Sequence, residues 1–585
     1  MAQALQNIAI QAPAFQGINT EDSPLSQDPT YAQRSNNAVL DSFGRLGARR
    51  GFREYADSWD FSAITPPSSW DSYVATTESM AHSEGVRPLI GLSVQWFDKD
   101  EISLGTQYYF GFVDVATREV EVVDIPSPYA LANVVKGQIV AFKPALVGFF
   151  DGGSDNTKYY VFGTGAMLEA DPVTSTVVLA NSNSNWIPPQ DDTGVFSTIM
   201  DGTVACAAYG RLWVSGVGGN YQRIYYSSLE NPYHWYDGRA VQEDSLNTGG
   251  VIDVSQYWPN GVDQIRGIVA HNNMLVVFGR NSVLMYGNPQ GDPASVGGIF
   301  LQDTIDGMGL VSRDAVCSNG SDVLFVDDSG VRSLGRSIQE QSVAIGDLTA
   351  NVRTEIKTLI AATTDKAEIS LSYWLQEGLV VCNFDREGKA YILDQRKLSS
   401  SGGARVTTWS EVSFDRSIHV EEGNTTLTLL GGDVGLGHYS GYADNINDAY
   451  VMSYVSNPLT FGDSVREKFP KRYDVTVATR NTATAFTARW GVDGTIQYGK
   501  AITADAQAPG FYYDPDSVVD AGYEVEGLAL WGEGSFGRGD LQLTRYRINT
   551  KGSGPAISLG VDATILGGFF SLQELNVQTQ IGRIY

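Results

Sequence analysis

The sequence is poor in the residues that build metal and redox sites. Its 585 residues include only three cysteines and five histidines. The cysteines lie far apart in apolar surroundings and form no C-x-x-C pair, so we interpret them as small buried hydrophobic residues. No two histidines have a metal-ligand spacing such as H-x-x-x-H, so a metal-activated water is not supported. These residues are Cys206, Cys317, Cys382, His82, His234, His271, His419 and His438.

Positive charge is also scarce. Forty Lys and Arg residues stand against 67 Asp and Glu residues, which gives a formal net charge of −27. A protein that grips nucleic acid neutralises phosphates with Lys and Arg, so this balance argues against adhesion to DNA. It still permits DNA to pass in contact with the protein. The simpler alternative is that the excess acid only keeps a large particle in solution.

Long apolar runs are missing as well. Nowhere do about 18 apolar residues follow one another, as a membrane-spanning helix requires. The segment Met1–Asn7 lacks the basic stretch and apolar run of a Sec-type signal peptide. We therefore expect synthesis in a cytoplasm and no stable membrane insertion. With no G-x-S-x-G elbow in the sequence either, we expect no enzymatic activity, no catalytic residues and no cofactor.

What the sequence does contain favours an all-β fold. Glycine reaches 63 residues, tyrosine 29 and phenylalanine 24, a composition typical of sheets and tight turns. From Leu89 onward, short runs rich in Val, Ile, Tyr and Phe alternate with clusters of Gly, Asn, Asp and Ser. One helix is predicted, from Asp347 to Ala361, because Leu348, Val352, Ile356 and Leu359 recur at helical spacing behind a capping Asp347.

A unit of buried runs between polar turns repeats through the middle of the chain. The runs begin near Leu212, Leu275, Leu324 and Leu379, at intervals of roughly 50 to 60 residues. After several of these units comes a second hairpin, as in Val326–Leu334 and Phe384–Leu393. Four strands in each radially repeated unit predict a β-propeller, whose number of blades the sequence leaves open.

The two ends of the chain differ from this repeat. Residues 1–60 are polar and hold the basic cluster Arg45–Arg53, so we predict an extended N-terminal arm. The propeller, with insertions, is assigned to residues 61–465. Residues 466–585 show short strands at regular spacing, and we predict an antiparallel β-sandwich there.

Four motifs suggest chemistry, and each has a simpler explanation. Gly532–Gly537 matches G-x-G-x-x-G, but a strand and not a helix follows it, which favours a glycine-rich hairpin. Arg538–Asp540 is an Arg-Gly-Asp match of only three residues. Asp327 and Asp328 resemble a glycosidase pair, yet neighbouring side chains on a strand point to opposite faces, which favours a turn. The aromatic stretch Tyr221–Tyr236 predicts either packing between blades or a platform for a sugar or base.

The same aromatic stretch carries a family resemblance. The sequences R-L-W-V-S-G (211–216), Q-R-I-Y-Y-S-S-L-E-N-P-Y-H-W-Y (222–236) and I-R-G-I-V-A-H-N-N-M-L-V-V-F-G-R-N-S-V-L-M-Y-G (265–287) resemble the central part of podovirus tail nozzle proteins, also called tail tubular protein B. The segments 17–24, 36–41 and 44–52 look like the opening of that family, and 309–316 followed by 323–334 is similar to its next blade. The match spans scattered pieces from about residue 15 to residue 335.

The resemblance implies a structural subunit in the tail tube of a short-tailed bacteriophage. In that family six copies form a ring below a twelve-subunit adaptor, with fibres near the adaptor boundary, and the nozzle closes and opens the channel for DNA ejection. The expected location is the virion tail, after synthesis in the host cytoplasm. Six copies of this chain would carry a formal charge on the order of −160, which would let double-stranded DNA slide without specific binding.

Two other functional classes remain open. A glycan-binding or glycan-cleaving β-propeller used in receptor recognition predicts a deep pocket of aromatic and carboxylate side chains. A solitary scaffold propeller of cellular origin predicts a monomer that never forms six-fold rings. A long polar N-terminal segment favours assembly over both.

Overall fold

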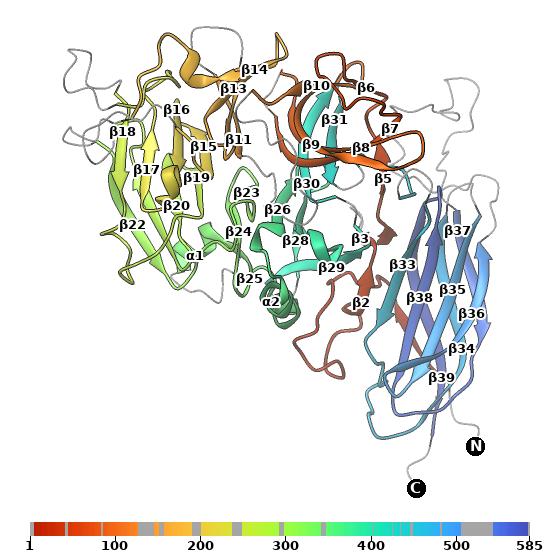
Figure 1. Ribbon diagram of the computed structural model, residues 1–585. Helices are drawn as coiled ribbons and strands as arrows, with labels where there is room; N and C mark the ends of the chain where they lie inside the picture. The colour runs from red at the N-terminus through yellow and green to blue at the C-terminus, as the bar shows by residue number, and fades with distance from the viewer. Residues whose placement is uncertain are drawn as a thin grey trace, which may run out of the picture.

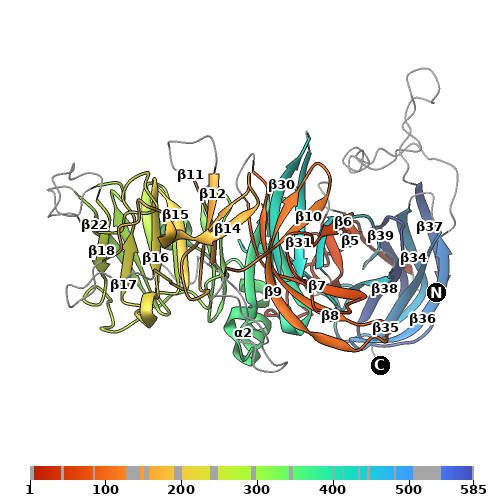
Figure 2. The same cartoon turned by 45° about the horizontal axis from the view of Figure 1, so that its top comes forward.

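The computed structural model describes most of the chain. The described residues are 5–40, 45–82, 86–126, 145–150, 157–189, 200–236, 248–291, 298–340, 347–399, 402–412, 414–423, 425–432, 435–444, 448–479, 483–504 and 542–582. The fold is all-β, as predicted, and consists of a β-propeller beside an antiparallel β-sandwich. Figure 1 shows the sandwich in blue at one side of the propeller, and Figure 2 shows the same arrangement from a second direction.

Seven sheets of the described chain make up the propeller. The first two sheets are β6 (Ser58–Asp60), β7 (Ser72–Ala81), β8 (Leu89–Phe97), β9 (Ser103–Asp114) and β10 (Glu119–Asp124), then β11 (Ala145–Phe150), β12 (Thr157–Phe162), β13 (Leu168–Asp171) and β14 (Thr176–Leu179). The third and fourth are β15 (Val204–Ala208), β16 (Arg211–Ser215), β17 (Arg223–Tyr226) and β18 (Gly250–Asp253), then β19 (Gly267–His271), β20 (Met274–Phe278), β21 (Ser282–Gly287) and β22 (Phe300–Asp306).

The remaining three sheets complete the ring. They are β23 (Val316–Ser318), β24 (Val323–Asp327) and β25 (Gly330–Ser333); then β26 (Ile369–Trp374), β27 (Leu379–Phe384), β28 (Lys389–Leu398) and β29 (Ala404–Ser410); and last β30 (Arg416–Glu422), β31 (Thr425–Gly432), β32 (Gly435–Ser440) and β5 (Gly51–Glu54). Strands β7, β11, β15 and β19 of the first four sheets contact one another in order, as do β23, β26 and β30 of the last three, and β30 contacts β7 of the first sheet. Phe278 and Phe325 join the fourth and fifth sheets, with ring centroids 5.0 Å apart. In the described part of the chain, the propeller is therefore a closed ring of seven blades.

The strands predicted from the repeat are the second strands of four consecutive blades. Leu212, Leu275, Leu324 and Leu379 lie in β16, β20, β24 and β27, and each is buried. Second strands are covered on both faces by the neighbouring blades, which explains their continuous apolar character. The hairpin predicted at Val326–Leu334 is also present, as β24 and β25.

Helices are few in the described chain. They are α1 (Leu334–Glu340), α2 (Arg353–Ala362) and five short 3₁₀ segments: η1 (Ala180–Ser182), η2 (Val217–Gly219), η3 (Ala350–Val352), η4 (Lys366–Glu368) and η5 (Asp385–Glu387). The predicted helix at Asp347–Ala361 is confirmed as α2, but it starts later and Asp347 does not cap it. The Asp347 carboxylate instead accepts hydrogen bonds from Thr349 and Arg353, which stabilises the turn ahead of the helix.

The sandwich is built from two antiparallel sheets around one core. One sheet contains β1 (Leu5–Ile10), β3 (Ala38–Leu40), β4 (Leu46–Ala48), β39 (Phe570–Ile581), β34 (Lys468–Thr479) and β37 (Gln542–Asn549). The other contains β2 (Ala32–Asn36), β33 (Tyr450–Ser456), β38 (Ile557–Ile565), β35 (Thr484–Val492) and β36 (Thr495–Ala504). Their inner faces share a buried cluster that includes Tyr454, Tyr473, Phe486 and Leu559.

These sheets divide the chain differently from the expected boundaries. Strand β33 already belongs to the sandwich, although it precedes residue 466. Residues 1–60 were expected to form a polar arm outside any core, yet Ile10, Ala32, Leu46 and Phe52 are buried. The segment is extended, as predicted, and except for β3, which pairs with β4 of the same segment, its strands pair with strands from distant parts of the sequence. The segment contains few apolar residues, yet it can join a buried core because its partner strands in both domains supply the other apolar side chains.

Candidate functional site

The aromatic stretch Tyr221–Tyr236 packs between blades. Tyr226, Tyr233 and Trp235 are buried. The Tyr233 hydroxyl donates a 2.8 Å hydrogen bond to Glu169 of the second blade, and its ring meets Tyr160 of that blade edge-on. The packing interpretation is confirmed for these residues, and their rings offer no open platform to a sugar or base.

Asp327 and Asp328 form a turn, as favoured from the sequence. Asp327 is buried and accepts hydrogen bonds from the backbone N–H groups of Ser329 and Gly330 at 2.7 and 3.0 Å. It also pairs with Arg332, while Asp328 pairs with Arg280 of the fourth blade. The two carboxylates are thus held by different arginines and do not face each other.

The cysteines and histidines are dispersed. Cys382 is buried, and Cys206 and Cys317 are half-buried. Burial raises the pKa of the Cys206 thiol to about 11 and that of Cys382 to about 12. His419 contacts the Tyr373 carbonyl oxygen at 2.7 Å. Within the described ranges, no group of three or more His, Cys, Asp or Glu side chains is arranged to hold a metal ion. The motifs at 532–537 and 538–540 lie outside those ranges.

The junction between the two domains holds a buried polar network around Arg49. The Arg49 guanidinium bonds both oxygens of Asp444, Nη1 to Oδ1 at 2.8 Å and Nη2 to Oδ2 at 2.6 Å, and its Nε donates to Asn37 at 3.1 Å. It also lies over the rings of Tyr450 and Trp409, at 4.3 and 5.6 Å from their centroids. Trp409 belongs to the sixth blade and Tyr450 to the sandwich, so one buried arginine contacts both domains.

A shared sheet reinforces this junction. Strand β2 pairs with β29 of the sixth blade on one side and with β33 of the sandwich on the other. The result is a continuous sheet of nine strands that passes from the propeller into the sandwich. In Figure 1, β2, β3 and β5 run in red between the two domains. This lacing by the N-terminal segment was not foreseen from the sequence, because strand pairing between distant segments leaves no local pattern.

The outer face of the sandwich carries a basic cluster. Asp474 on β34 is buried and lies within 2.5 Å of Arg472, 2.9 Å of Arg545 and 3.5 Å of Arg547. The side chains of Arg545 and Arg547 are 49% and 62% exposed. Three arginines on one carboxylate leave a local excess of positive charge, in a chain whose net charge is −27.

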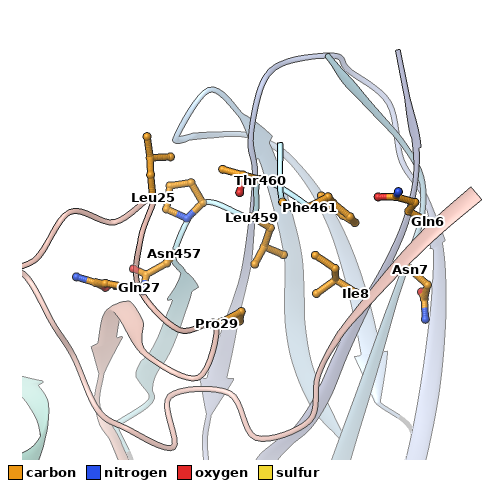
Figure 3. A pocket seen from close by; sticks show the side chains of 12 residues that line it. Gln6, Asn7, Ile8, Leu25, Gln27, Pro29, Asn457, Leu459, Thr460 and Phe461 are labelled. Atoms are coloured by element: carbon orange, nitrogen blue, oxygen red, sulfur yellow. Dashed lines mark hydrogen bonds between the residues drawn. The ribbon is translucent and has the colours of Figure 1, made fainter. Parts of the chain in front are cut away.

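A cavity of about 350 Å³ lies at the edge of the sandwich, between β1, the segment 25–29 and the loop 457–462. Figure 3 shows Ile8, Leu459 and Phe461 gathered on one side of it and Gln27 with Asn457 on the other. The Asn457 amide donates a 2.6 Å hydrogen bond to Gln27 Oε1, and Gln27 in turn donates to the Asp22 carbonyl oxygen at 2.8 Å. None of the lining side chains is charged.

The fold defines the chain as an all-β protein with a propeller and a sandwich. No family model and no curated protein matches the sequence. Solved structures similar to it include Hsv2 of Kluyveromyces lactis, with 9% identity, coverage of 58% of this chain and 99% of that chain, and a TM-score of 0.26. Another is the exo-β-1,3-galactanase of Phanerochaete chrysosporium with β-1,3-galactotriose, with 9% identity, coverage of 90% and 100%, and a TM-score of 0.25. Likenesses this weak say nothing about function.

None of the described helices is both long and apolar enough to cross a membrane.

Proposed function

We propose that this chain is a structural subunit of the tail tube of a short-tailed bacteriophage, where it forms the distal channel for DNA ejection below the adaptor. The observation that supports the proposal most is the lacing of the two domains by residues 5–54. Strands β1, β3 and β4 of this segment join the sandwich, β5 closes the seventh blade, and β2 lies between the domains. A subunit that forms the wall of a conduit has to keep its domains in a fixed relation, and this lacing does so.

The side chains that suggested chemistry also support a non-enzymatic role. Tyr233 and Trp235 pack between blades, and Asp327 is used in a turn. The alternative of a glycan-binding or glycan-cleaving propeller predicts a deep pocket of aromatic and carboxylate side chains, and the residues that the sequence singled out for it are used in packing and in a turn. The tail-tube proposal therefore has the better support.

The mechanism follows from charge and assembly. Six copies around a channel would present a strongly acidic body to the DNA, and like charge in a narrow lumen repels the duplex instead of holding it. Propeller loops that project into the lumen would gate the channel through a shift at subunit interfaces. The proposed partners are five further copies of the chain, the adaptor ring and the tail fibres, and the proposed location is the virion.

Mass spectrometry of purified particles tests this function. The chain should be present in the tail of the phage that encodes it, in a ratio of six copies to twelve adaptor subunits. The purified chain should also leave bacterial polysaccharides uncleaved. Its absence from particles, or sustained turnover of a polysaccharide, would refute the proposal.

A further inference from the structure

Strand β37 presents a basic row on the outer face of the sandwich. Leu543, Arg545 and Arg547 stand at alternate positions of the strand, so their side chains lie on one side of the sheet. Leu543 is 49% exposed, and the two arginine side chains are 49% and 62% exposed. Carboxylates on the same face belong to the other strands of the sheet, Asp474 on β34 and Glu574 on β39. The positive charge is therefore concentrated on β37.

This β37 row lies at the edge of the sheet that is remote from the propeller. The strand order is β3-β4-β39-β34-β37, and β3 at the opposite end contacts β29 of the sixth blade. Figure 1 shows β37 on the side of the sandwich that is turned away from the propeller. Among the described strands, β37 pairs only with β34. A partner for the β37 row is therefore expected from another molecule.

One end of the first blade exposes apolar side chains. Trp70, just before β7, is 37% exposed, and Ile102, in the turn between β8 and β9, is 61% exposed. Two backbone hydrogen bonds place them at the same end of the blade. The Asp71 N–H donates to the Phe97 carbonyl oxygen at 2.8 Å, and the Asp98 N–H donates to the Ile102 carbonyl oxygen at 3.0 Å. Grouped exposed side chains of this kind mark contact surfaces more often than scattered ones do.

The Trp70 ring is held in a fixed orientation. It meets the rings of Trp96 and Phe61 edge-on, with centroids 4.9 and 5.9 Å away. A side chain that is already ordered loses little conformational entropy on binding, and tryptophan is enriched among the residues that dominate protein interfaces. A guanidinium group is attracted to the face of a tryptophan ring. Trp70 therefore suits an arginine-bearing partner.

The rim of this surface is acidic. Asp71, Asp100 and Glu101 are exposed beside the half-exposed Asp98, and Lys99 is the one cation in the segment 98–102. We call Trp70, Asp71 and residues 98–102 the blade-one tip. Its charge repels a polyanion such as DNA and attracts a basic surface. An apolar centre with an acidic rim is thus complementary to the β37 row, where Leu543 stands beside two arginines.

We propose that the β37 row of one copy binds the blade-one tip of a second copy. The two surfaces differ, so the contact is head-to-tail, and such contacts build a ring when the rotation between copies closes. The inference rests on the self-assembly in the proposed function and names the faces that meet. DNA is the competing occupant of the β37 row. It offers nothing apolar to Leu543, and the net charge of −27 opposes its approach.

Charge reversal tests the contact on the full chain by sedimentation velocity at about 0.1 M salt. One variant carries Arg545→Glu with Arg547→Glu, and the other carries Asp100→Lys with Glu101→Lys. Each alone should raise the concentration needed for assembly at least tenfold, because two like-charged surfaces then meet. Asp303→Lys with Asp306→Lys, at two exposed carboxylates on β22, makes the same change of charge elsewhere and should leave assembly unchanged.

Mixing the two variants gives the sharper result. The arginine variant carries two acidic surfaces and the blade-one variant two basic ones, so in a mixture they should alternate and assemble like the wild type. Failure of this rescue between folded variants, or assembly of either variant as efficient as that of the β22 control, would overturn the proposal. If the arginine variant does not fold beside Asp474, the blade-one variant decides, since its substitutions lie in an exposed turn.

A second arm measures binding of a short DNA duplex by fluorescence anisotropy. Loss of DNA binding in the arginine variant, with its self-assembly intact, would assign the β37 row to a polyanion and overturn the proposal. Wild-type rings that are insensitive to both reversals would refute this contact and leave the tail-tube function standing. Mutual rescue of the variants of a chain that is absent from phage particles would do the reverse. A wild type that never self-associates would overturn both.

Discussion

Arg49 and Asp444 form a two-point ion pair at the boundary between propeller and sandwich, and their side chains are only 5% and 12% exposed. Arg49 lies just before β5, the strand that completes the seventh blade, and Asp444 lies between β32 of that blade and β33 of the sandwich. The pair therefore links the start of the propeller to its end and to the second domain.

Asp444→Asn should destabilise the protein by about 3–5 kcal/mol, because it leaves the buried Arg49 charge without a counter-charge. Chemical denaturation at neutral pH measures the effect. Asp463→Asn is the matched control, since Asp463 pairs with a half-exposed Arg466, and it should destabilise the protein far less than Asp444→Asn. Equal effects of the two variants would contradict the proposed role of the junction.

Phe52→Ala tests whether the N-terminal segment is part of the folded body. Phe52 in β5 is 4% exposed and packs against the backbone at Gly437 of β32. The substitution should cost about 3–5 kcal/mol, as for other buried aromatics. Phe300→Ala makes the same chemical change at a side chain that is 50% exposed, and it should cost less than about 1 kcal/mol. If the N-terminal segment were instead an arm that detaches from the folded body, Phe52→Ala and Phe300→Ala would both cost little stability.

The sequence predicted the parts of the fold that have a local signature. Runs such as Leu275–Phe278 and the turn at Asp328–Ser329 depend on neighbours in sequence, so the blades were visible. The course of residues 5–54 was not, because its strands are stabilised by partners as remote as β39 and β32. The number of blades was hidden for the same reason, since the seventh blade borrows its outermost strand from before the first.

The thiols offer a test of burial. Burial raises the pKa of Cys206 to about 11 and that of Cys382 to about 12, and it raises the pKa of Cys317 as well. At pH 8 all three should be protonated and react slowly with a thiol reagent, because the thiolate is the nucleophile. After denaturation, all three thiols should react with the reagent. A thiol that reacts in the native protein as fast as free cysteine would contradict this description of the core.

The Asp474 cluster predicts a dependence on pH. Burial raises the Asp474 pKa, but the hydrogen bond and charge of Arg472, with the charges of Arg545 and Arg547, lower it by more, so the net pKa lies below its usual range. A lowered carboxyl pKa stabilises the fold above the unfolded value of about 3.9, and this stability is lost as the pH falls through the folded value.

Asp474→Asn should therefore cost about 1–3 kcal/mol at pH 7 and reduce the loss of stability between about pH 4 and pH 2, as measured by denaturation at each pH. Asp562→Asn is the control, because Asp562 pairs with the half-exposed Arg489, and it should cost less than about 1 kcal/mol. Parallel pH profiles for wild type and Asp474→Asn would contradict the assignment.

The candidate sites were harder to predict from the sequence than the blades were. The packing of Tyr233 and the turn at Asp327 could be favoured from pattern alone, because both depend on local geometry. The cavity could not, because Ile8, Gln27 and Asn457 come from three distant segments and none belongs to a recognisable motif. The left-handed backbone of Phe461 could not be predicted from the sequence either. Bulky residues seldom adopt a positive φ, so a phenylalanine gives no indication of this conformation.

Electron microscopy of the purified chain, alone and mixed with its adaptor, tests the proposed function most directly. The tail-tube account predicts six-fold rings that stack below the adaptor and enclose a channel wide enough for a DNA duplex. A protein that stays monomeric at every concentration and does not join the adaptor would contradict it.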